Sequence, residues 1–275
     1  MTETNNEFDE DALAEAYNRA LALEKSGDFD AAALAYAQVL ALDPADHGGA
    51  AVRLAAIGKG ETPEKAPEAY VETLFDQHAG AFEDILVDAL GYCVPLLIRQ
   101  QLQMLELGPF ENMLDLGCGT GLTGGALRDL VAGEITGLDL SENMVEIAYE
   151  KELYENLYVA ECVDYLHENE EGPFDIITAA DVLPYIGALE PLFAGVAGNI
   201  KDGGLFAFSS ETRDDAFTGA KGYKVGPSQR FVHSETYVRR SLAEAGFDVL
   251  SITDINVRME NGNPSPGHLV IARRM

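Results

Sequence analysis

The chain has 275 residues, which is enough for one large domain with an extension at roughly 100–200 residues per domain. It carries 47 acidic and 18 basic side chains, so its formal net charge is −29. Such a field repels nucleic acid and anionic membrane surfaces, and the chain has no basic run that could neutralise a phosphate backbone. We therefore expect neither kind of partner.

The cysteines and the first residues indicate the compartment. Cys93, Cys118 and Cys162 are widely spaced and match no zinc-binding or disulfide pattern, so we expect no disulfide scaffold and no metal. The first residues are polar and acidic, and no apolar stretch reaches the ~18–20 residues of a membrane span. These features predict a soluble, cytoplasmic protein.

Residues 11–42 are rich in alanine at helical spacing, with an interruption at Ser26-Gly27-Asp28. We predict two antiparallel helices, with Gly27 at the end of the first, Asp28 as the cap of the second and Pro44 after its last turn.

The second of these helices resembles a tetratricopeptide repeat. The resemblance rests on the Gly-Asp-Phe turn at 27–29, small Ala32, aromatic Tyr36 and the closing Leu-Asp-Pro at 42–44. The first helix lacks the large residue and the glycine-tyrosine pair of that family. We assign residues 1–57 to this extension, including a partial second helix around 50–57. Because one repeat cannot bury its own apolar face, it either packs on the catalytic domain or a second copy, or recruits a protein partner.

Glycine and proline between residues 58 and 68 oppose helix formation, so this segment is predicted to be a linker. The remainder, 69–275, forms the main domain and begins with a helical part, 69–110, which includes a helix through 94–104.

Beyond residue 110, short Val- and Ile-rich runs alternate with helical patterns, which predicts βαβ units and a parallel sheet. The predicted strands are 112–116, 134–139, 157–161, 174–179, 205–209, 249–256 and 268–272. A short turn separates the last two, so one strand of the C-terminal hairpin is expected to be antiparallel.

The first of these strands leads into a glycine-rich turn, 115–121, that opens a helix. This arrangement places backbone N–H groups at the carboxyl edge of the sheet, where nucleotide-like ligands bind. A dinucleotide turn requires glycine where Leu122 stands, whereas Gly121 falls one residue earlier. Asp115 at the strand end would repel a pyrophosphate and attract the sulfonium and ammonium of S-adenosylmethionine (SAM). Asp139, ending the second strand, is placed to accept both ribose hydroxyls of either cofactor.

From residue 112 onward the chain resembles the class I SAM-dependent methyltransferases. The resemblance implies a Rossmann-like, seven-stranded, mostly parallel sheet with one antiparallel C-terminal strand. It also implies SAM as cofactor and S-adenosylhomocysteine (SAH) as product. The residues that it places at the cofactor are Asp115, Gly117, Cys118, Gly119 and Gly121 in the turn, Asp139 on the ribose, Leu140 and Met144 on the adenine, and Glu161, Cys162 and Ala179 in the later motifs. The family usually has aspartate where Glu161 stands, so Glu161 or Asp164 receives the adenine amino group, and we prefer Glu161.

The N-terminal hairpin, the segment 74–82 and this domain together resemble a bacterial group of predicted methyltransferases with a tetratricopeptide-like repeat. In many small-molecule methyltransferases a helix similar to the one at 75–82 folds over the cofactor as a lid. The alternative is an amphipathic helix that simply packs on the sheet.

In-line methyl transfer requires a base only if the acceptor must lose a proton. The candidates are Asp181 beside the expected methyl site, Tyr185 just beyond it and His233, which follows a long loop after the fifth strand. A histidine in such a loop is more often a cap or a surface residue.

We predict a SAM-dependent methyltransferase that acts on a small molecule. A protein acceptor recruited by the repeat is the alternative within this class, and a DNA-adenine methyltransferase is disfavoured because 180–183 lacks the Asn/Asp-Pro-Pro-aromatic motif. The other classes are an NAD-linked oxidoreductase and a noncatalytic SAM-binding adaptor. No motif identifies the acceptor or the oligomeric state.

Overall fold

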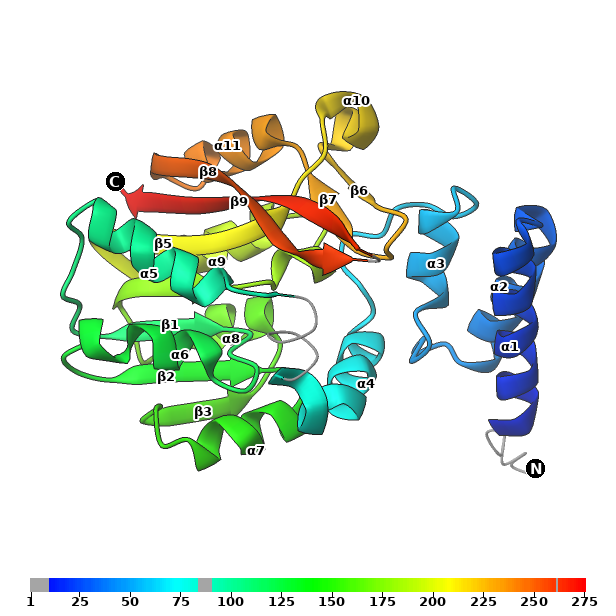
Figure 1. Cartoon of the computed structure of the whole chain (residues 1–275), viewed down its shortest axis with the longest axis horizontal. Coiled ribbons are helices and arrows are strands. Elements are labelled where there is room, and N and C mark those ends of the chain that lie inside the picture. The colour runs from blue at the N-terminus through cyan, green and yellow to red at the C-terminus, as the bar shows by residue number, and fades with distance from the viewer. Residues whose placement is uncertain (1–9, 84–90, 261) are drawn as a thin grey trace, which may run out of the picture.

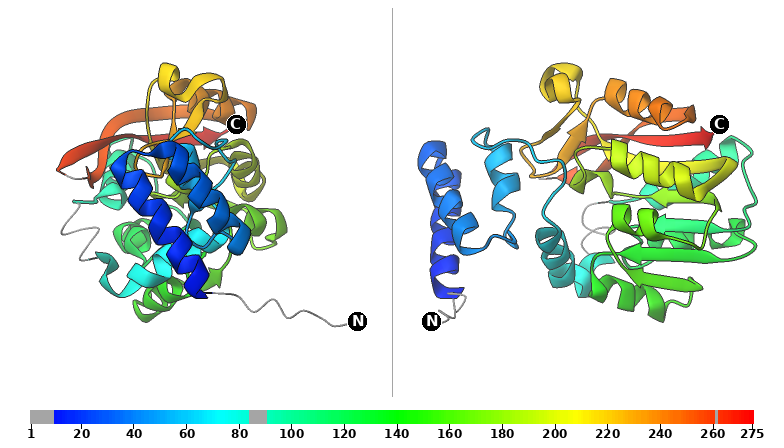
Figure 2. Two further views of the ribbon diagram at one scale, coloured as in Figure 1. Left: turned by 90° about the vertical axis from the view of Figure 1, so that its right-hand side faces the viewer. Right: turned by 180° about the vertical axis from the view of Figure 1, so that it is seen from behind.

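The computed structural model describes residues 10–83, 91–260 and 262–275. Residues 1–9 of the predicted extension and 84–90 of the predicted helical segment lie outside the described residues. A twisted sheet with helices on both faces forms the main body, and a helical hairpin stands at one end of it (Figures 1 and 2). None of the described helices is long and apolar enough to cross a membrane.

The hairpin consists of α1 (Glu10–Ser26) and α2 (Phe29–Leu42). Gly27 makes the turn between them with φ +81°, a left-handed conformation that glycine adopts without a Cβ clash. The Asp28 carboxylate accepts a hydrogen bond from the backbone N–H of Ala31 and caps α2. The two helices and their turn are therefore formed as the sequence predicts.

A third helix, α3 (Ala50–Ala56), connects the hairpin to the main body. Val52 and Ala55 belong to the core of the main domain, whereas Ala50 packs in the hairpin core. Arg53 donates hydrogen bonds to Tyr17 and Glu24 of α1. Helix α3 thus packs on both the hairpin and the main body, and the view from behind in Figure 2 shows it between the two.

The main sheet has the strand order β3-β2-β1-β4-β5-β9-β8. Strand β9 runs antiparallel to both its neighbours, β5 and β8, and the other pairs are parallel. This confirms the predicted class I methyltransferase architecture. The strands are β1 (Met113–Leu116), β2 (Ile135–Asp139), β3 (Asn156–Val159), β4 (Phe174–Ala179), β5 (Ile200–Glu211), β8 (Phe247–Glu260) and β9 (Asn263–Arg274).

Side chains alternate between two cores on the two faces of the sheet. Leu114 and Leu116 of β1 face the core that includes α8, α9 and α11, whereas Met113 faces the one that includes α5 and α6. The helices that follow the hairpin and α3 are α4 (Glu68–His78), η1 (Ala79–Ala81), α5 (Val94–Met104), α6 (Leu122–Leu127), η3 (Arg128–Leu130), α7 (Glu142–Glu150), α8 (Cys162–Glu168), η4 (Leu183–Tyr185), α9 (Glu190–Asn199), α10 (Asp215–Thr218), η5 (Gly219–Lys221) and α11 (Glu235–Glu244).

Two regions differ from the sequence predictions. The long loop expected after the fifth strand contains a hairpin of β6 (Tyr223–Val225) and β7 (Phe231–His233). Within the predicted linker 58–68, Lys65 pairs with Ile186, and the N–H of Ala66 donates to the carbonyl of Tyr185 at 2.8 Å. The end of that linker is therefore part of the main domain.

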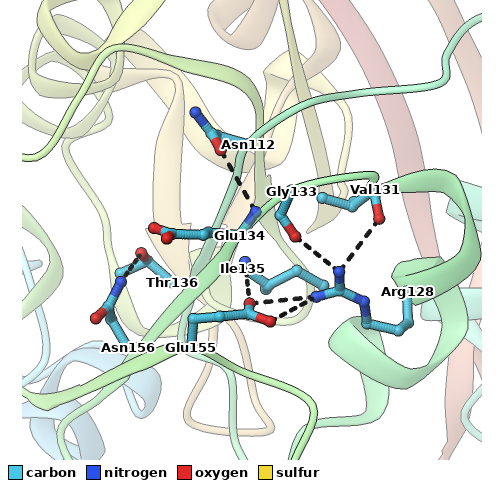
Figure 3. A network of polar contacts seen from close by, with 9 residues as sticks. All are labelled: Asn112, Arg128, Val131, Gly133, Glu134, Ile135, Thr136, Glu155 and Asn156. Atoms are coloured by element: carbon cyan, nitrogen blue, oxygen red, sulfur yellow. Dashed lines mark hydrogen bonds and ion pairs between the residues drawn. The ribbon is translucent and has the colours of Figure 1, made fainter.

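At the amino edge of the sheet, a polar network fixes the start of β2 (Figure 3). Glu155 accepts hydrogen bonds from the backbone N–H of Ile135 at 2.7 Å and from the Arg128 guanidinium. Arg128 also donates to the carbonyls of Val131 and Gly133. These contacts fix the first residue of β2, and they therefore help to position Asp139, the last residue of the same strand, at the carboxyl edge of the sheet.

Candidate cofactor and acceptor site

A cavity lies at the carboxyl edge of the sheet, at the ends of β1, β2 and β4. The strand order reverses here, because the chain proceeds outward from β1 to β2 and β3 and then returns to β4 on the other side. The cavity encloses about 1050 Å³, its open mouth included. An open α/β sheet binds its ligand at such a reversal point.

The glycine turn forms the floor of this cavity. Gly117, Gly119 and Gly121 have φ values of +62°, +53° and +91°, so each adopts a conformation that L side chains avoid. A Cβ on Gly117 would come within 2.5 Å of Val182, whereas one on Gly119 would meet, among the described residues, only Phe82, at 3.8 Å. Gly119 therefore leaves space above the turn that a ligand can occupy.

Asp139 connects this turn to the end of β2. One carboxylate oxygen accepts the N–H of Gly119 and the other accepts the N–H of Ser141, each at 2.9 Å. Burial raises the pKa of Asp139, and these backbone donors oppose that rise. Each oxygen retains a lone pair for a further donor, so the carboxylate is able to accept two hydroxyls from the cavity.

Asp115 does not line the cavity, contrary to the expectation that it lies beside a cationic ligand. Its side chain is fully buried under the turn and accepts hydrogen bonds from Tyr154 at 2.8 Å and Thr178 at 2.7 Å. The side chains of β1 alternate, which turns Asp115 to the opposite face from Leu114 and Leu116. It supports the turn from below and is not placed to contact a ligand in the cavity directly.

Burial also gives a testable pH dependence, because it raises the pKa of Asp115 from 3.8 to about 6. The folded state then binds the proton more tightly than the unfolded state, so this group's contribution to stability is lost as pH rises through 6. Relative to Asp115→Asn, the free energy of unfolding of the unmodified chain should fall by roughly 1 kcal/mol from pH 5 to pH 7. Urea unfolding at both pH values measures this difference. The control is Asp248→Asn, at an exposed position of β8. If Asp115→Asn and Asp248→Asn alter the pH dependence of the free energy of unfolding equally, the raised pKa of Asp115 is contradicted.

Glu161, the predicted adenine ligand, lines the cavity, but one of its carboxylate oxygens is already hydrogen-bonded. Oε2 accepts the N–H groups of Val163 at 2.7 Å and Asp164 at 2.9 Å and so caps α8. Oε1 lies 3.9 Å from the Lys65 ammonium. Asp164, the alternative adenine ligand, is exposed and does not line the cavity.

The structure brings together seven of the eleven predicted cofactor-binding residues. Those that line the cavity are Gly117, Cys118, Gly119, Asp139, Leu140, Glu161 and Cys162. Besides Asp115, three others lie outside the lining. Gly121 is the residue before α6 and lies against the Tyr154 ring, Met144 is fully buried in α7, and Ala179 is buried in β4, so that Ala180 lines the cavity in its place.

Of the three predicted bases, Asp181 and Tyr185 line the cavity and His233 does not. His233 is fully buried, and its Nε2 lies 2.9 Å from the carbonyl oxygen of Ile186 and 3.2 Å from that of Gly187. Burial lowers the pKa of His233 to about 4. It is a neutral structural side chain that ties β7 to the segment after η4, and it is not placed to take a proton from an acceptor.

The segment over the turn is held at both ends by acidic side chains. Asp76 accepts hydrogen bonds from the hydroxyl of Ser141 and, at 3.4 Å, the N–H of Asn143. Glu83 accepts from the Thr120 hydroxyl at 2.7 Å and pairs with Lys151. Between these contacts, the rings of Phe75 and Phe82 line the cavity and stand edge to face at 6.0 Å. The segment covers the glycine turn, as a lid does.

Several lining residues were not predicted. Lys65 and Ala66 come from the segment read as a linker, and Tyr92 precedes α5. Arg230, singled out only as part of a loop, reaches the cavity from the turn between β6 and β7. The glycine and proline content around Lys65 resembles that of any connecting segment, so no local signal could have placed these residues.

Comparison with known proteins agrees with this geometry. Residues 114–206, from β1 into β5, match the model of a family described as "Methyltransferase domain". Phosphoethanolamine N-methyltransferase 2 of Caenorhabditis elegans is 26% identical over 74% of this chain and 46% of its own length. Ubiquinone biosynthesis O-methyltransferase of Bordetella avium is 30% identical over 38% of this chain and 44% of its own. The chain thus spans less than half the length of these curated relatives.

Among solved structures, a SAM-dependent methyltransferase from Clostridium acetobutylicum superposes with a TM-score of 0.53 at 19% identity, covering 71% of this chain and 97% of that one. This similarity establishes the fold. The family match at residues 114–206 lies within this fold.

Proposed function

We propose that the chain is a SAM-dependent methyltransferase that transfers a methyl group to a small-molecule acceptor and releases SAH. The observation that carries the proposal is the Asp139 carboxylate at the cavity floor, which holds the N–H of Gly119 and retains lone pairs for ribose hydroxyls. The family match over 114–206 and the named activities of the relatives support the same chemistry.

The residues of the cavity fit this cofactor. Asp139 would accept the ribose hydroxyls, Leu140 would pack on the adenine, and Glu161 would take the adenine amino group on the carboxylate oxygen that does not cap α8. When bound, SAM supplies a methyl group already activated by its sulfonium. The chain then has to align the acceptor and exclude water, and the rings of Phe75 and Phe82 over the turn serve the second purpose.

A small acceptor is favoured because the cavity is covered by the segment that carries these two rings and is bounded by Lys65 and Ala66. If the acceptor must lose a proton, the Asp181 carboxylate is the candidate base. Tyr185 is less suited to this role, because burial raises its pKa to about 12 and favours its neutral form. The relatives that methylate nitrogen and oxygen leave the acceptor atom of this chain open.

Calorimetry with the full chain tests the proposal. SAH should bind saturably at one site, and NAD should not bind. Binding of NAD in the absence of SAH binding would overturn the proposal in favour of an oxidoreductase. Binding of SAH without methyl consumption from labelled SAM, over a broad acceptor panel, would favour the noncatalytic adaptor.

A further inference from the structure

Four charged side chains gather beyond the expected methyl site. Asp181 follows β4, Glu211 ends β5, Arg230 precedes β7 and Arg258 lies on β8. Their side chains are 13%, 4%, 23% and 3% exposed, respectively. Arg230 and Asp181 line the cavity, whereas Glu211 and Arg258 lie behind them.

The ion pairs in this cluster are uneven. Arg258 and Glu211 form a close pair, with Nη2 and Oε1 2.7 Å apart, and the same Nη2 lies 3.9 Å from the more exposed Glu260 carboxylate. Arg230 Nη1 lies 3.5 Å from Asp181 and 3.9 Å from Glu211, and Arg258 Nη1 lies 3.9 Å from Asp181. Within the described part of the chain, five buried polar atoms of the cluster have no hydrogen-bond partner: Arg230 Nη1, Asp181 Oδ1, Glu211 Oε1, and Nη1 and Nη2 of Arg258.

Such unsatisfied groups lower the stability of the fold, since each buried polar atom without a hydrogen-bond partner costs about 1–3 kcal/mol of folding free energy. Ion clusters of this kind are also no better for stability than apolar side chains of similar volume. Asp181 adds backbone strain, because its φ of +63° lies in the left-handed region, where its N–H donates to Ser209. A cost of this size at the wall of a cavity indicates a ligand that completes the hydrogen bonds.

Arg230 is further oriented by an aromatic ring. Its guanidinium lies over Tyr185, 5.6 Å from the ring centroid, and Tyr185 in turn stands edge to face with Phe75 at 5.3 Å. The guanidinium is planar and presents a fork of N–H donors that matches the two oxygens of a carboxylate or a phosphate. Arg258 does not line the cavity, so Arg230 is the cation of this cluster whose unused donor lies at the cavity wall.

We propose that Arg230 binds an oxyanion, a carboxylate or a phosphate, carried by the methyl acceptor. The inference rests on the proposed methyl transfer and names the substrate class of that site. An acceptor oxyanion supplies the partner that Arg230 Nη1 lacks. Because the lining is rich in aromatic rings, an acceptor with an aromatic ring next to its oxyanion fits this end of the cavity.

Benzoate, phenyl phosphate and benzamide are suitable probes, since they share the ring and differ in charge. Calorimetry on the SAH-saturated full chain should detect benzoate or phenyl phosphate, and benzamide should bind at least about 10-fold more weakly. The stronger of the two oxyanions tells whether the site takes a carboxylate or a phosphate. Equal binding of benzamide and benzoate, or no binding of either oxyanion, would overturn the proposal.

Substitutions of Arg230 test whether this side chain binds the oxyanion. Arg230→Met should reduce oxyanion binding at least about 10-fold, and benzamide binding should not change. Arg230→Lys keeps the charge opposite Asp181, and therefore the fold, but loses the planar fork, so a reduction of at least about 3-fold is expected. The matched control is Arg240→Met, because Arg240 also lies over a tyrosine, Tyr237, at 5.3 Å but on the surface. Oxyanion binding that survives both Arg230 changes would refute the assignment.

SAH titration of each protein separates this proposal from the proposed function. If the unmodified chain binds no SAH, the methyltransferase proposal fails, and the same probes are then titrated into the chain without SAH. If SAH binds normally to all variants but neither benzoate nor phenyl phosphate binds as expected, only the assignment of Arg230 to the acceptor oxyanion is overturned.

Discussion

Asp139→Ala is expected to weaken SAH binding by at least about 100-fold. The carboxylate would lose two charge-assisted hydrogen bonds to the ribose, each worth about 1.5–3 kcal/mol. It would also release the N–H groups of Gly119 and Ser141, which it holds at 2.9 Å, so the turn itself would lose its orientation. Calorimetric titration of SAH into the full chain measures the effect.

Two controls make this result specific. Asp248→Ala removes an exposed carboxylate of β8 and should leave SAH affinity unchanged. Asp139→Asn keeps the size of the side chain and one acceptor, so it should fall between the unmodified chain and the alanine variant. Unchanged SAH affinity in Asp139→Ala, with thermal unfolding as before, would rule out the ribose assignment.

Local patterns predicted the parts of the fold that local interactions determine. The helix at 94–104 has the expected bounds, because Pro95 fits its first turn and Ile98 and Leu102 repeat at helical spacing on the buried face. Strand β4 also has its predicted bounds, since it is a short, almost wholly buried run. In such segments burial and hydrogen bonding within the element favour the same conformation.

Long-range contacts determine the parts that were missed. Lys65 and Ala66 become a cavity wall only by pairing with Tyr185 and Ile186, and no neighbouring residue encodes that pairing. Strands β6 and β7 have three residues each, too few for an alternating pattern, so the hairpin that carries Arg230 was read as a loop.

The site shows the same division between local and tertiary information. The glycine spacing predicted the turn itself, and Asp139 was placed at the cavity because the carboxyl ends of parallel strands share one edge. The prediction that Asp115 lies beside the ligand was wrong. Its hydrogen-bond partners, Tyr154 and Thr178, come from distant segments that meet only in the folded sheet. His233 was misplaced for the same reason, since its buried partners lie after η4.

Gly119→Val is expected to reduce SAH binding by at least about 100-fold while the chain remains folded. A Cβ at this position points into the space below Phe82, with the ring 3.8 Å away, so the two methyl groups of valine would fill the volume that the ligand needs. The φ of +53° adds strain of roughly 1–2 kcal/mol for a residue with a side chain.

The matched control for this variant is Gly203→Val. Gly203 has φ +78°, and no atom of the described residues lies within 4 Å of the point that a Cβ would occupy, so valine brings comparable backbone strain at a position away from the cavity. Both variants should therefore lose a similar amount of thermal stability, and only Gly119→Val should lose SAH binding. If Gly119→Val still binds SAH as tightly as Gly203→Val, the ligand does not lie against this turn. Because Gly119 contacts Asp139 through its N–H, such a result together with a normal Asp139→Ala titration would place the cofactor outside the carboxyl edge of β1 and β2.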